Sequence, residues 1–213
     1  MMSEQTLYIA LTVVVGYLLG SLNGAIIASK NVFKKDIRNF GSGNAGLTNF
    51  HRTFGVRGIV IVMLVDVLKT VLATLIGRLL SPLGGYDVSV GIMLAGFGVC
   101  LGHVYPIYYN FKGGKGILTG GTLAWMIDWR VGVCAWGIFL IFVIFTQYVS
   151  LGSIAAAITL AASVCIFIPS PTAKILALIS AALIVFAHRE NIKRLRNGTE
   201  SKLSFGGRPK DDE

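Results

Sequence analysis

The sequence predicts an all-α fold, a polytopic membrane bundle of about seven transmembrane helices. Hydrophobic residues make up 54% of the 213-residue chain and charged residues only 14%, with a mean hydropathy of +0.72. Apolar segments of about 20 residues recur, which is the length that crosses roughly 30 Å of hydrocarbon as a helix. The alternation typical of outer-membrane barrels is absent. No basic region precedes the first apolar stretch, so no cleaved signal peptide is predicted.

The predicted helices are separated by segments rich in glycine, proline and polar residues. They span about residues 7–29, 58–80, 89–110, 117–128, 131–148, 150–168 and 173–188. The fourth and the seventh are short for a full crossing. At about 1.5 Å per residue, the fourth reaches only about 18 Å. We therefore expect it to be a partial or strongly mismatched span.

The basic residues predict the orientation in the membrane. Of 19 lysines and arginines, 15 fall in residues 30–57, 112–115 and 189–210, all on one side of the predicted bundle. By the positive-inside rule this side is cytoplasmic, which leaves the N-terminus outside and the C-terminus in the cytoplasm. The net charge of +9 needs no nucleic-acid partner, since orientation and attraction to anionic lipid account for it.

Cysteine usage gives no sign of a metal site or a disulfide framework. Cys100, Cys134 and Cys165 all lie in apolar runs and are predicted to be buried small hydrophobic residues. None belongs to a CxxC pair, and no cluster of acidic residues, histidine and cysteine has metal-ligand spacing. We expect no cofactor and activity that is insensitive to chelators.

The first of three glycine-rich and basic segments begins at Gly41. The letters GSGNAG match a dinucleotide-binding fingerprint, but a charged stretch precedes them and a membrane helix follows, so the required βαβ context is missing. The glycines still allow backbone N–H groups to approach an anion closely. The candidate ligands of a phosphate are Gly41, Ser42, Gly43, Asn44, Thr48, Asn49 and Arg52. The alternative is a flexible glycine linker.

The second segment contains His103 and then the turn from Lys112 to Gly116. It is not a P-loop, because the first glycine and the Ser/Thr of that motif are missing. A Gly-Gly-Lys-Gly turn at a helix start nevertheless combines free N–H groups, a helix dipole and an ammonium group. The candidates are His103, Lys112, Gly113, Gly114, Lys115 and Gly116. Alternatively, the lysines signal only topology and His103 is a packing or interfacial histidine.

The third segment follows the last apolar run. On a continuing helix His188, Asn191 and Leu195 share one face, since positions i, i+3 and i+7 align. Within the second predicted helix, Asp66 and Lys69 lie three residues apart on one face. Isolated charges in a bilayer are costly. This pair is therefore either self-neutralising or part of a site that braces the basic loops.

Together these motifs resemble one family, the bacterial acyl-phosphate:glycerol-3-phosphate acyltransferases, or PlsY family. The matching patterns are Asp36-Ile37-Arg38 leading into Gly41-Ser42-Gly43-Asn44-x-Gly46-x-Thr48-Asn49-x-x-Arg52-x-x-Gly55; Gly102-His103-x-x-Pro106 with Phe111-Lys112-Gly113-Gly114-Lys115-Gly116; and His188-Arg189-x-Asn191-Ile192-x-Arg194-Leu195. The resemblance covers nearly the whole chain. It implies that Ser42, Asn44, Arg52, Lys115, His188 and Asn191 correspond to the family's active-site residues.

The resemblance implies transfer of a fatty acyl group from acyl phosphate to the 1-hydroxyl of sn-glycerol 3-phosphate, giving lysophosphatidic acid and inorganic phosphate. It implies a multi-pass enzyme of the bacterial inner membrane with a cytoplasm-facing site, functionally linked to the enzyme that supplies acyl phosphate. Residues 1–202 would form one membrane-embedded acyltransferase domain. Residues 203–213 would be a mobile cytoplasmic tail.

The chemistry demands no covalent nucleophile, because acyl phosphate already has an excellent leaving group. The sequence contains no G-x-S-x-G elbow. We expect Ser42, Gly43, Lys115 and the Gly113–Gly116 amides to hold one phosphate, and Arg52 the other. His188 and Asn191 would position the glycerol hydroxyl or polarise the carbonyl, while Asp66, Lys69 and His103 complete the substrate site. The alternative function is a transporter of a phosphorylated small molecule.

Overall fold

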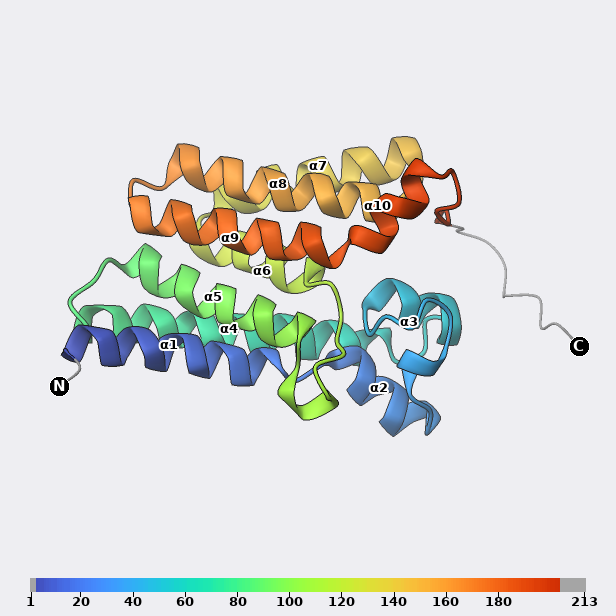
Figure 1. Cartoon of the computed structure of the whole chain (residues 1–213), viewed down its shortest axis with the longest axis horizontal. Helices are drawn as coiled ribbons and strands as arrows, with labels where there is room; N and C mark the ends of the chain where they lie inside the picture. Colours follow the sequence, from blue (N-terminus) through green and yellow to red (C-terminus); the bar gives the residue numbers. More distant parts are fainter. Residues whose placement is uncertain (1–2, 204–213) are drawn as a thin grey trace, which may run out of the picture.

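The computed structural model describes residues 3–203, and within that range it contains helices and no strand. The long helices pack side by side into an elongated bundle (Figure 1). Its elements are α1 (Glu4–Gly20), α2 (Gly24–Phe33), η1 (Ile37–Asn39), α3 (Leu47–Phe54), α4 (Ile59–Leu83), α5 (Val88–Val104), η2 (Ile107–Tyr109), α6 (Ile117–Ile127), α7 (Trp129–Thr146), α8 (Val149–Phe167), α9 (Pro171–Ala187) and α10 (Arg189–Arg196). The predicted all-α class is confirmed.

Five segments are long and apolar enough to cross a membrane: Glu4–Phe33, Ile59–Leu83, Val88–Tyr109, Trp129–Thr146 and Val149–Phe167. The bent pair α9 and α10 brings the number to six if it is one span. The 11-residue α6 is too short for the same criterion, as expected for the predicted helix at 117–128. Apart from Leu203, the predicted tail 203–213 lies outside the described residues.

The predicted helix at 7–29 is wrong in one respect, because it is broken between α1 and α2. The Asn23 side chain caps α2 by accepting a hydrogen bond from the N–H of Ile26, at 3.0 Å. The carbonyls of Gly20 and Leu22 turn instead to the ammonium group of Lys69, at 3.1 and 2.6 Å. Asn23-Gly24 is a local signal for such a break, and the side chain of Lys69 from another helix stabilises it.

The predicted helix at 89–110 also ends earlier than expected. Helix α5 stops at Val104, and Pro106 begins the turn into η2. Proline has no N–H and restricts the residue before it, so Tyr105 leaves the helical region. The chain then passes through Asn110 and Phe111, both at positive φ, into the glycine turn before α6.

Small residues let α1, α4 and α5 pack closely. A methyl group on Gly77 of α4 would collide with the carbonyl of Gly91 on α5. One on Gly16 of α1 would collide with the carbonyl of Ala95. Such small contacts are typical of membrane bundles, in which van der Waals packing replaces the hydrophobic effect between helices. The outer face of α4 is leucine-rich: Leu64, Leu68, Leu72, Leu75 and Leu79 are exposed, as a lipid-facing surface requires.

The short helices α2, α3 and α10 lie at the end of the bundle opposite the start of α1 (Figure 1). The three segments that the sequence singles out all reach this end. Helices α6 and α8 also begin there, so their N-terminal N–H groups, which carry a partial positive charge, face the same region.

Candidate active site

A cavity of about 670 Å³ opens at this end of the bundle. Loops and helix ends from all three predicted segments line it. Its lining includes Gly41, Ser42, Asn44, Thr48, Asn49, Arg52, Asp66, His103, Lys115, Gly116, His188 and Asn191 among the predicted site residues. Gly43, Lys69, Lys112, Gly113 and Gly114 do not line it. The cavity therefore gathers most of the predicted residues, although they are up to 150 positions apart.

Asn49 organises the glycine loop. Its side-chain oxygen accepts from the N–H of Ser42, and its NH₂ group donates to the carbonyls of Phe40 and Asn44, all at 3.0 Å. A side chain on Gly41, which has a φ of +56°, would collide with this amide. Asn49 is buried and its amide is hydrogen-bonded at both ends, so it stabilises the loop that carries Ser42.

Helix α3 begins inside the glycine segment, a helix that sequence analysis did not predict. Its N-cap, Gly46, offers no side chain to the first turn, and the N–H groups of Leu47 and Thr48 have no acceptor within residues 3–203. Gly46, Leu47 and Thr48 all line the cavity. Uncapped N–H groups at a helix start bind anions readily. Arg52 extends from the same helix into the cavity and is exposed there.

The glycine loop contacts the lysine turn directly. The N–H of Ala45 donates to the carbonyl of Gly113 at 3.3 Å. The expectation that the Gly113 and Gly114 amides bind phosphate is wrong, because they donate to the carbonyls of Val104 and His103, at 3.2 and 3.0 Å. These bonds continue the end of α5 and fix the turn.

The Gly43 amide is likewise engaged rather than free. It donates to the carbonyl of Phe40 at 3.0 Å, which closes a turn around Gly41 and Ser42. The expected role of this amide in phosphate binding is therefore also wrong. Gly43 has a φ of +69°, so the residue serves the shape of the loop.

Backbone N–H groups without an acceptor in the described residues lie at the start of α6 rather than at Gly113 and Gly114. Gly116 is the N-cap, with a φ of +81° that favours glycine, and it provides no side-chain cap. The N–H groups of Ile117 and Leu118 have no acceptor in the described part of the chain. Lys115 lines the same cavity as Ile117 and Leu118. Burial, as the largest cause, and the positive charges of Arg194 and Arg52 together lower the pKa of Lys115 to about 8, against the opposing charge of Glu200.

Lys115 is joined to the third segment through Asn191. Its ammonium donates to the Asn191 side-chain oxygen. The NH₂ group of Asn191 donates to one oxygen of Glu200 at 2.7 Å, and Nε of Arg194 donates to the other at 2.7 Å. Burial opposes ionisation of Glu200, but the nearby Ser150 hydroxyl and the donors of Asn191 and Arg194 outweigh it and lower the pKa of this carboxyl.

Arg194 and Glu200 are site residues that sequence analysis missed. Arg194 belongs to the motifs of the resemblance without a predicted role, and Glu200 lies in the predicted domain 1–202 but is not among its predicted site residues. The signal was present in the charge pattern, because Glu200 is an isolated acid among the many basic residues of this end. Its strap, Asn197–Leu203, is tied back by the N–H of Leu203, which donates to the carbonyl of Gln147 at 2.7 Å.

His188 occupies the break between α9 and α10. The two helices meet at 57°, so the expected continuing helix is wrong, although His188 and Asn191 both still line the cavity. The N–H of His188 bonds back to Val185. Its ring Nδ1 lies 2.8 Å from the carbonyl of Ile184. Since a carbonyl only accepts, Nδ1 carries the proton, and Nε2 of the neutral ring is left as an acceptor.

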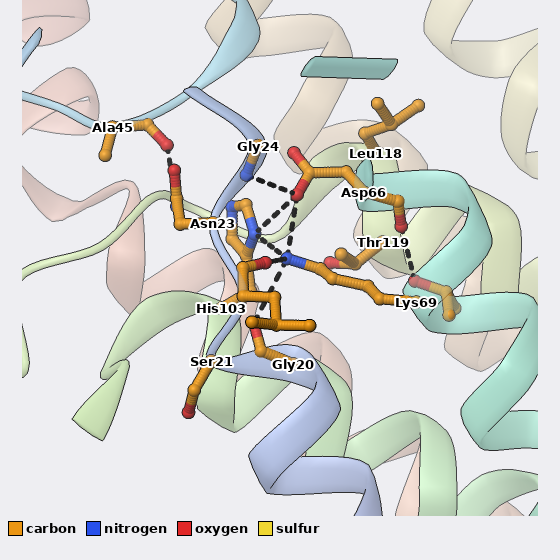
Figure 2. A network of polar contacts seen from close by, with 12 residues as sticks. Gly20, Ser21, Asn23, Gly24, Ala45, Asp66, Lys69, His103, Leu118 and Thr119 are labelled. Carbon is orange, nitrogen blue, oxygen red and sulfur yellow. Dashed lines mark hydrogen bonds and ion pairs between the residues drawn. The ribbon is translucent and has the colours of Figure 1, made fainter. Parts of the chain in front are cut away.

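Asp66, Lys69 and His103 form a buried polar cluster (Figure 2), and Asp66 and His103 also line the cavity. The ammonium of Lys69 lies 2.7 Å from a carboxylate oxygen of Asp66 and 2.9 Å from Nδ1 of His103. The same oxygen of Asp66 accepts from the N–H of Gly24 at 3.2 Å. Asp66 and Lys69 neutralise each other, which is the first of the two roles predicted for this pair. The cluster also braces the α1–α2 break below the site.

One wall of the cavity is apolar. It is formed by Met63, Ile117, Leu118, Trp136, Phe139 and Val149. A second, small apolar cavity of about 20 Å³ adjoins it between α6, α7, α8 and α9, sharing Ile117, Trp136 and Phe139. Because Asp66 is paired with Lys69 and Glu200 with Arg194, the charges left to face a ligand among the described lining residues are Lys115 and Arg52. No group of three potential metal ligands occurs in residues 3–203.

Comparisons with known proteins find relatives that match nearly the whole chain. Residues 10–198 match the family model "Glycerol-3-phosphate acyltransferase". The chain is 44% identical over 197 residues to the glycerol-3-phosphate acyltransferase of Thermoanaerobacter pseudethanolicus, covering 92% of this chain and 96% of that protein. It is 40% identical over 211 residues to the enzyme of Enterococcus faecalis, covering 95% of each.

Two solved structures are similar as well. Both are of PlsY, an integral membrane glycerol 3-phosphate acyltransferase. The glycerol 3-phosphate form has a TM-score of 0.82 and 33% identity, covering 92% of this chain and 96% of that one. The lysophosphatidic acid form has a TM-score of 0.80 and 31% identity, covering 92% and 95%. The chain therefore belongs to the PlsY family of integral membrane glycerol-3-phosphate acyltransferases.

Proposed function

We propose that the protein transfers a fatty acyl group from acyl phosphate to the 1-hydroxyl of sn-glycerol 3-phosphate, giving lysophosphatidic acid and inorganic phosphate. One observation carries the proposal: a single cavity joins Lys115, Arg52 and two uncapped helix starts to an apolar wall. Such a cavity suits two phosphorylated substrates, one of which carries an alkyl chain. The similar PlsY structures are described in forms with glycerol 3-phosphate and with lysophosphatidic acid.

The lining supports direct transfer, without an acyl-enzyme intermediate. The cavity contains no cysteine among its described lining residues. None of its serines is hydrogen-bonded to a histidine within residues 3–203, and His188 uses Nδ1 on a backbone carbonyl. A serine without a base is a weak nucleophile. A donor that already has a good leaving group, such as acyl phosphate, matches this lining better than a thioester does.

In the proposed reaction, the substrate hydroxyl attacks the acyl carbonyl. The new ester C–O bond forms, the C–O bond to phosphate breaks, and inorganic phosphate leaves with the bonding electron pair. The hydroxyl proton passes to the departing phosphate or to Nε2 of His188. Most of the acceleration would come from holding two mutually repelling anions together, and the rest from donors around the phosphate and the carbonyl.

The roles of the binding residues follow from their contacts. Ser42, the start of α3, the start of α6 and Lys115 would hold one phosphate, and Arg52 the other through two N–H groups. The main role of Asn191 would be to orient Lys115, since both ends of its amide are engaged. The apolar wall would take the acyl chain.

The setting would be the bacterial inner membrane, with the cavity facing the cytoplasm. The basic segments support this orientation. An amphiphilic donor could then arrive through the membrane from the enzyme that makes acyl phosphate, a functional link rather than a required complex. The phosphorylated glycerol would enter from the water side.

The deciding experiment is an assay of the purified protein in detergent. We expect lysophosphatidic acid and inorganic phosphate in equal amounts from a long-chain acyl phosphate and glycerol 3-phosphate, and no product when acyl-CoA replaces acyl phosphate. A Lys115→Ala variant purified in parallel controls for contaminating activity. Acylation from acyl-CoA alone, or no product from either donor, would refute the proposed donor. Since detergent abolishes transport but not acyl transfer, turnover also excludes the transporter alternative.

A further inference from the structure

The buried carboxylate of Asp66 uses only one of its two oxygens within the protein. That oxygen lies 2.7 Å from the ammonium of Lys69, accepts from the N–H of Gly24 at 3.2 Å and lies 3.6 Å from Nδ1 of His103. The second oxygen makes no hydrogen bond within residues 3–203, and no dashed line reaches it in Figure 2. An ionised carboxylate oxygen accepts hydrogen bonds and donates none, so this oxygen can take a donor from a ligand.

The side chain of Asp66 faces the cavity. It is only 2% exposed, yet it lines the cavity together with Met63, which lies one turn earlier on the same face of α4. Its second oxygen is not sealed among protein atoms. A carboxylate oxygen removed from bulk water is costly when it has no hydrogen bond, so a donor on a bound substrate would be a favourable partner.

The ion pair makes Asp66 compatible with a phosphorylated substrate. A lone carboxylate would repel a phosphate, but the ammonium of Lys69 compensates the charge of this one. Lys69 is in turn held by the carbonyls of Gly20 and Leu22, at 3.1 and 2.6 Å, so the pair is fixed in position. The second oxygen of Asp66 therefore suits a neutral donor such as a hydroxyl group, and not an anion.

Glycerol 3-phosphate carries two hydroxyl groups besides its phosphate, and each can donate one hydrogen bond. Among the ionisable side chains that line the cavity within residues 3–203, two have a free acceptor atom: Nε2 of His188 and the second oxygen of Asp66. Lys115 and Arg52 only donate. Both oxygens of Glu200 are already engaged. Two acceptors are thus available for two hydroxyl groups.

We infer that the second oxygen of Asp66 binds the 2-hydroxyl of glycerol 3-phosphate. His188, at the break between α9 and α10, is the acceptor for the reacting 1-hydroxyl, whereas Asp66 belongs to α4, which packs against α5 and α6. Fixing the 2-hydroxyl on one wall turns the 1-hydroxyl toward the acyl donor. Asp66 is then a specificity-determining residue. This inference rests on the proposed function and deepens it, because it assigns the glycerol part of the substrate.

The test uses 3-hydroxypropyl phosphate, which keeps the phosphate and the reacting primary hydroxyl but lacks the 2-hydroxyl. Values of kcat/KM are measured for this analogue and for glycerol 3-phosphate, with the full-length protein and saturating acyl phosphate. We expect the unmodified protein to prefer glycerol 3-phosphate by about 30-fold, since the analogue leaves a charged acceptor without its donor. In Asp66→Asn the preference should fall to about threefold, because a neutral amide oxygen is a weaker acceptor.

Thr70→Val is the matched control. Thr70 is buried on α4 and does not line the cavity, and its hydroxyl donates to the backbone carbonyl of Asp66 at 2.8 Å. Like Asp66→Asn, this replacement preserves the size of the side chain, and it should keep the full preference. Asp66→Asn should fold, because Lys69 retains the Gly20 and Leu22 carbonyls. If it does not, the double variant Lys69→Met/Asp66→Asn, in which this pair carries no charge, replaces it and should show the same weak preference.

Two results would overturn the inference. One is an unmodified protein that uses both substrates equally well. The other is a preference that stays at about 30-fold in Asp66→Asn. An equal loss of kcat on both substrates, with the preference intact, would belong to this second result and would place Asp66 at the reacting hydroxyl or in the scaffold.

Failure of the proposed function would be recognised separately. If the unmodified protein does not use acyl phosphate, binding is still measurable without turnover. Glycerol 3-phosphate should raise the thermal unfolding midpoint of the unmodified protein more than 3-hydroxypropyl phosphate does, and Asp66→Asn should remove this difference. The same difference in both proteins would reject the role of Asp66, whatever the acyl donor is.

Discussion

The ammonium group of Lys115 donates a hydrogen bond to the side-chain oxygen of Asn191, a residue 76 positions further along the chain. The other end of the same amide donates to Glu200. Asn191 therefore bridges the ammonium group of Lys115 and the carboxylate of Glu200 in the strap. This bridge connects the second and third segments and gives the first prediction.

Replacing Asn191 by Ala should lower kcat/KM by about 100-fold, because Lys115 loses the acceptor that orients it toward the phosphate. Asn191→Asp retains an acceptor for Lys115 but places a second carboxylate against Glu200, so we expect an intermediate loss. The measurement is steady-state kinetics of detergent-purified protein, with thermal unfolding to confirm folding. Full activity in the Ala variant would show that the bridge has no part in turnover.

The lowered pKa of Lys115 predicts a falling limb in the pH profile. Below a pKa of about 8 the side chain is an ammonium group and binds phosphate, whereas above it the neutral amine binds weakly. The value of kcat/KM should therefore fall as the pH rises through about 8. Lys115→Arg supplies a cation that does not titrate in this range, so its limb should move to higher pH. A limb at the same pH in both proteins would assign it to another group.

Arg52→Lys should raise the KM for glycerol 3-phosphate by about tenfold with a smaller change in kcat. A guanidinium group binds phosphate with two parallel N–H groups, whereas an ammonium group acts as a point charge. Kinetics at saturating acyl phosphate measure the effect. Arg57→Lys, on the neighbouring loop but not lining the cavity, is the matched control. An unchanged KM would count against two-pronged recognition by Arg52.

Lys69→Met should destabilise the protein by about 3 kcal/mol, because it leaves the buried carboxylate of Asp66 without its ammonium partner. Restoring neutrality with Asp66→Asn in the same chain should recover part of the loss. Denaturant unfolding in a fixed detergent compares the two variants. If the double variant were less stable than Lys69→Met, the contacts of Lys69 with the Gly20 and Leu22 carbonyls would outweigh the ion pair.

The sequence was informative wherever a pattern is local. Apolar runs located all seven predicted helical segments, and glycine and basic residues located the three segments that meet at the cavity. The short reach of α6 followed from its length alone. These features depend on neighbouring residues, so periodicity and composition are enough to predict them.

The remainder depended on contacts between distant residues. The α1–α2 break is stabilised by Lys69, 47 positions beyond Leu22, although the Asn23-Gly24 pair is a local signal for it. The Gly113 and Gly114 amides donate to carbonyls at the end of α5, a contact that the sequence of the turn does not indicate.

The return of the strap to Gln147 has a consequence for biosynthesis. The wall that carries Glu200 is made from residues 197–203, whereas Ser42 lies in the loop between α2 and α3. The cavity is therefore complete only after residues 197–203 have been synthesised and Leu203 has bonded to Gln147. A chain that stops before Asn197 would contain α1 to α10 but would lack Glu200, so its cavity would be open on that side.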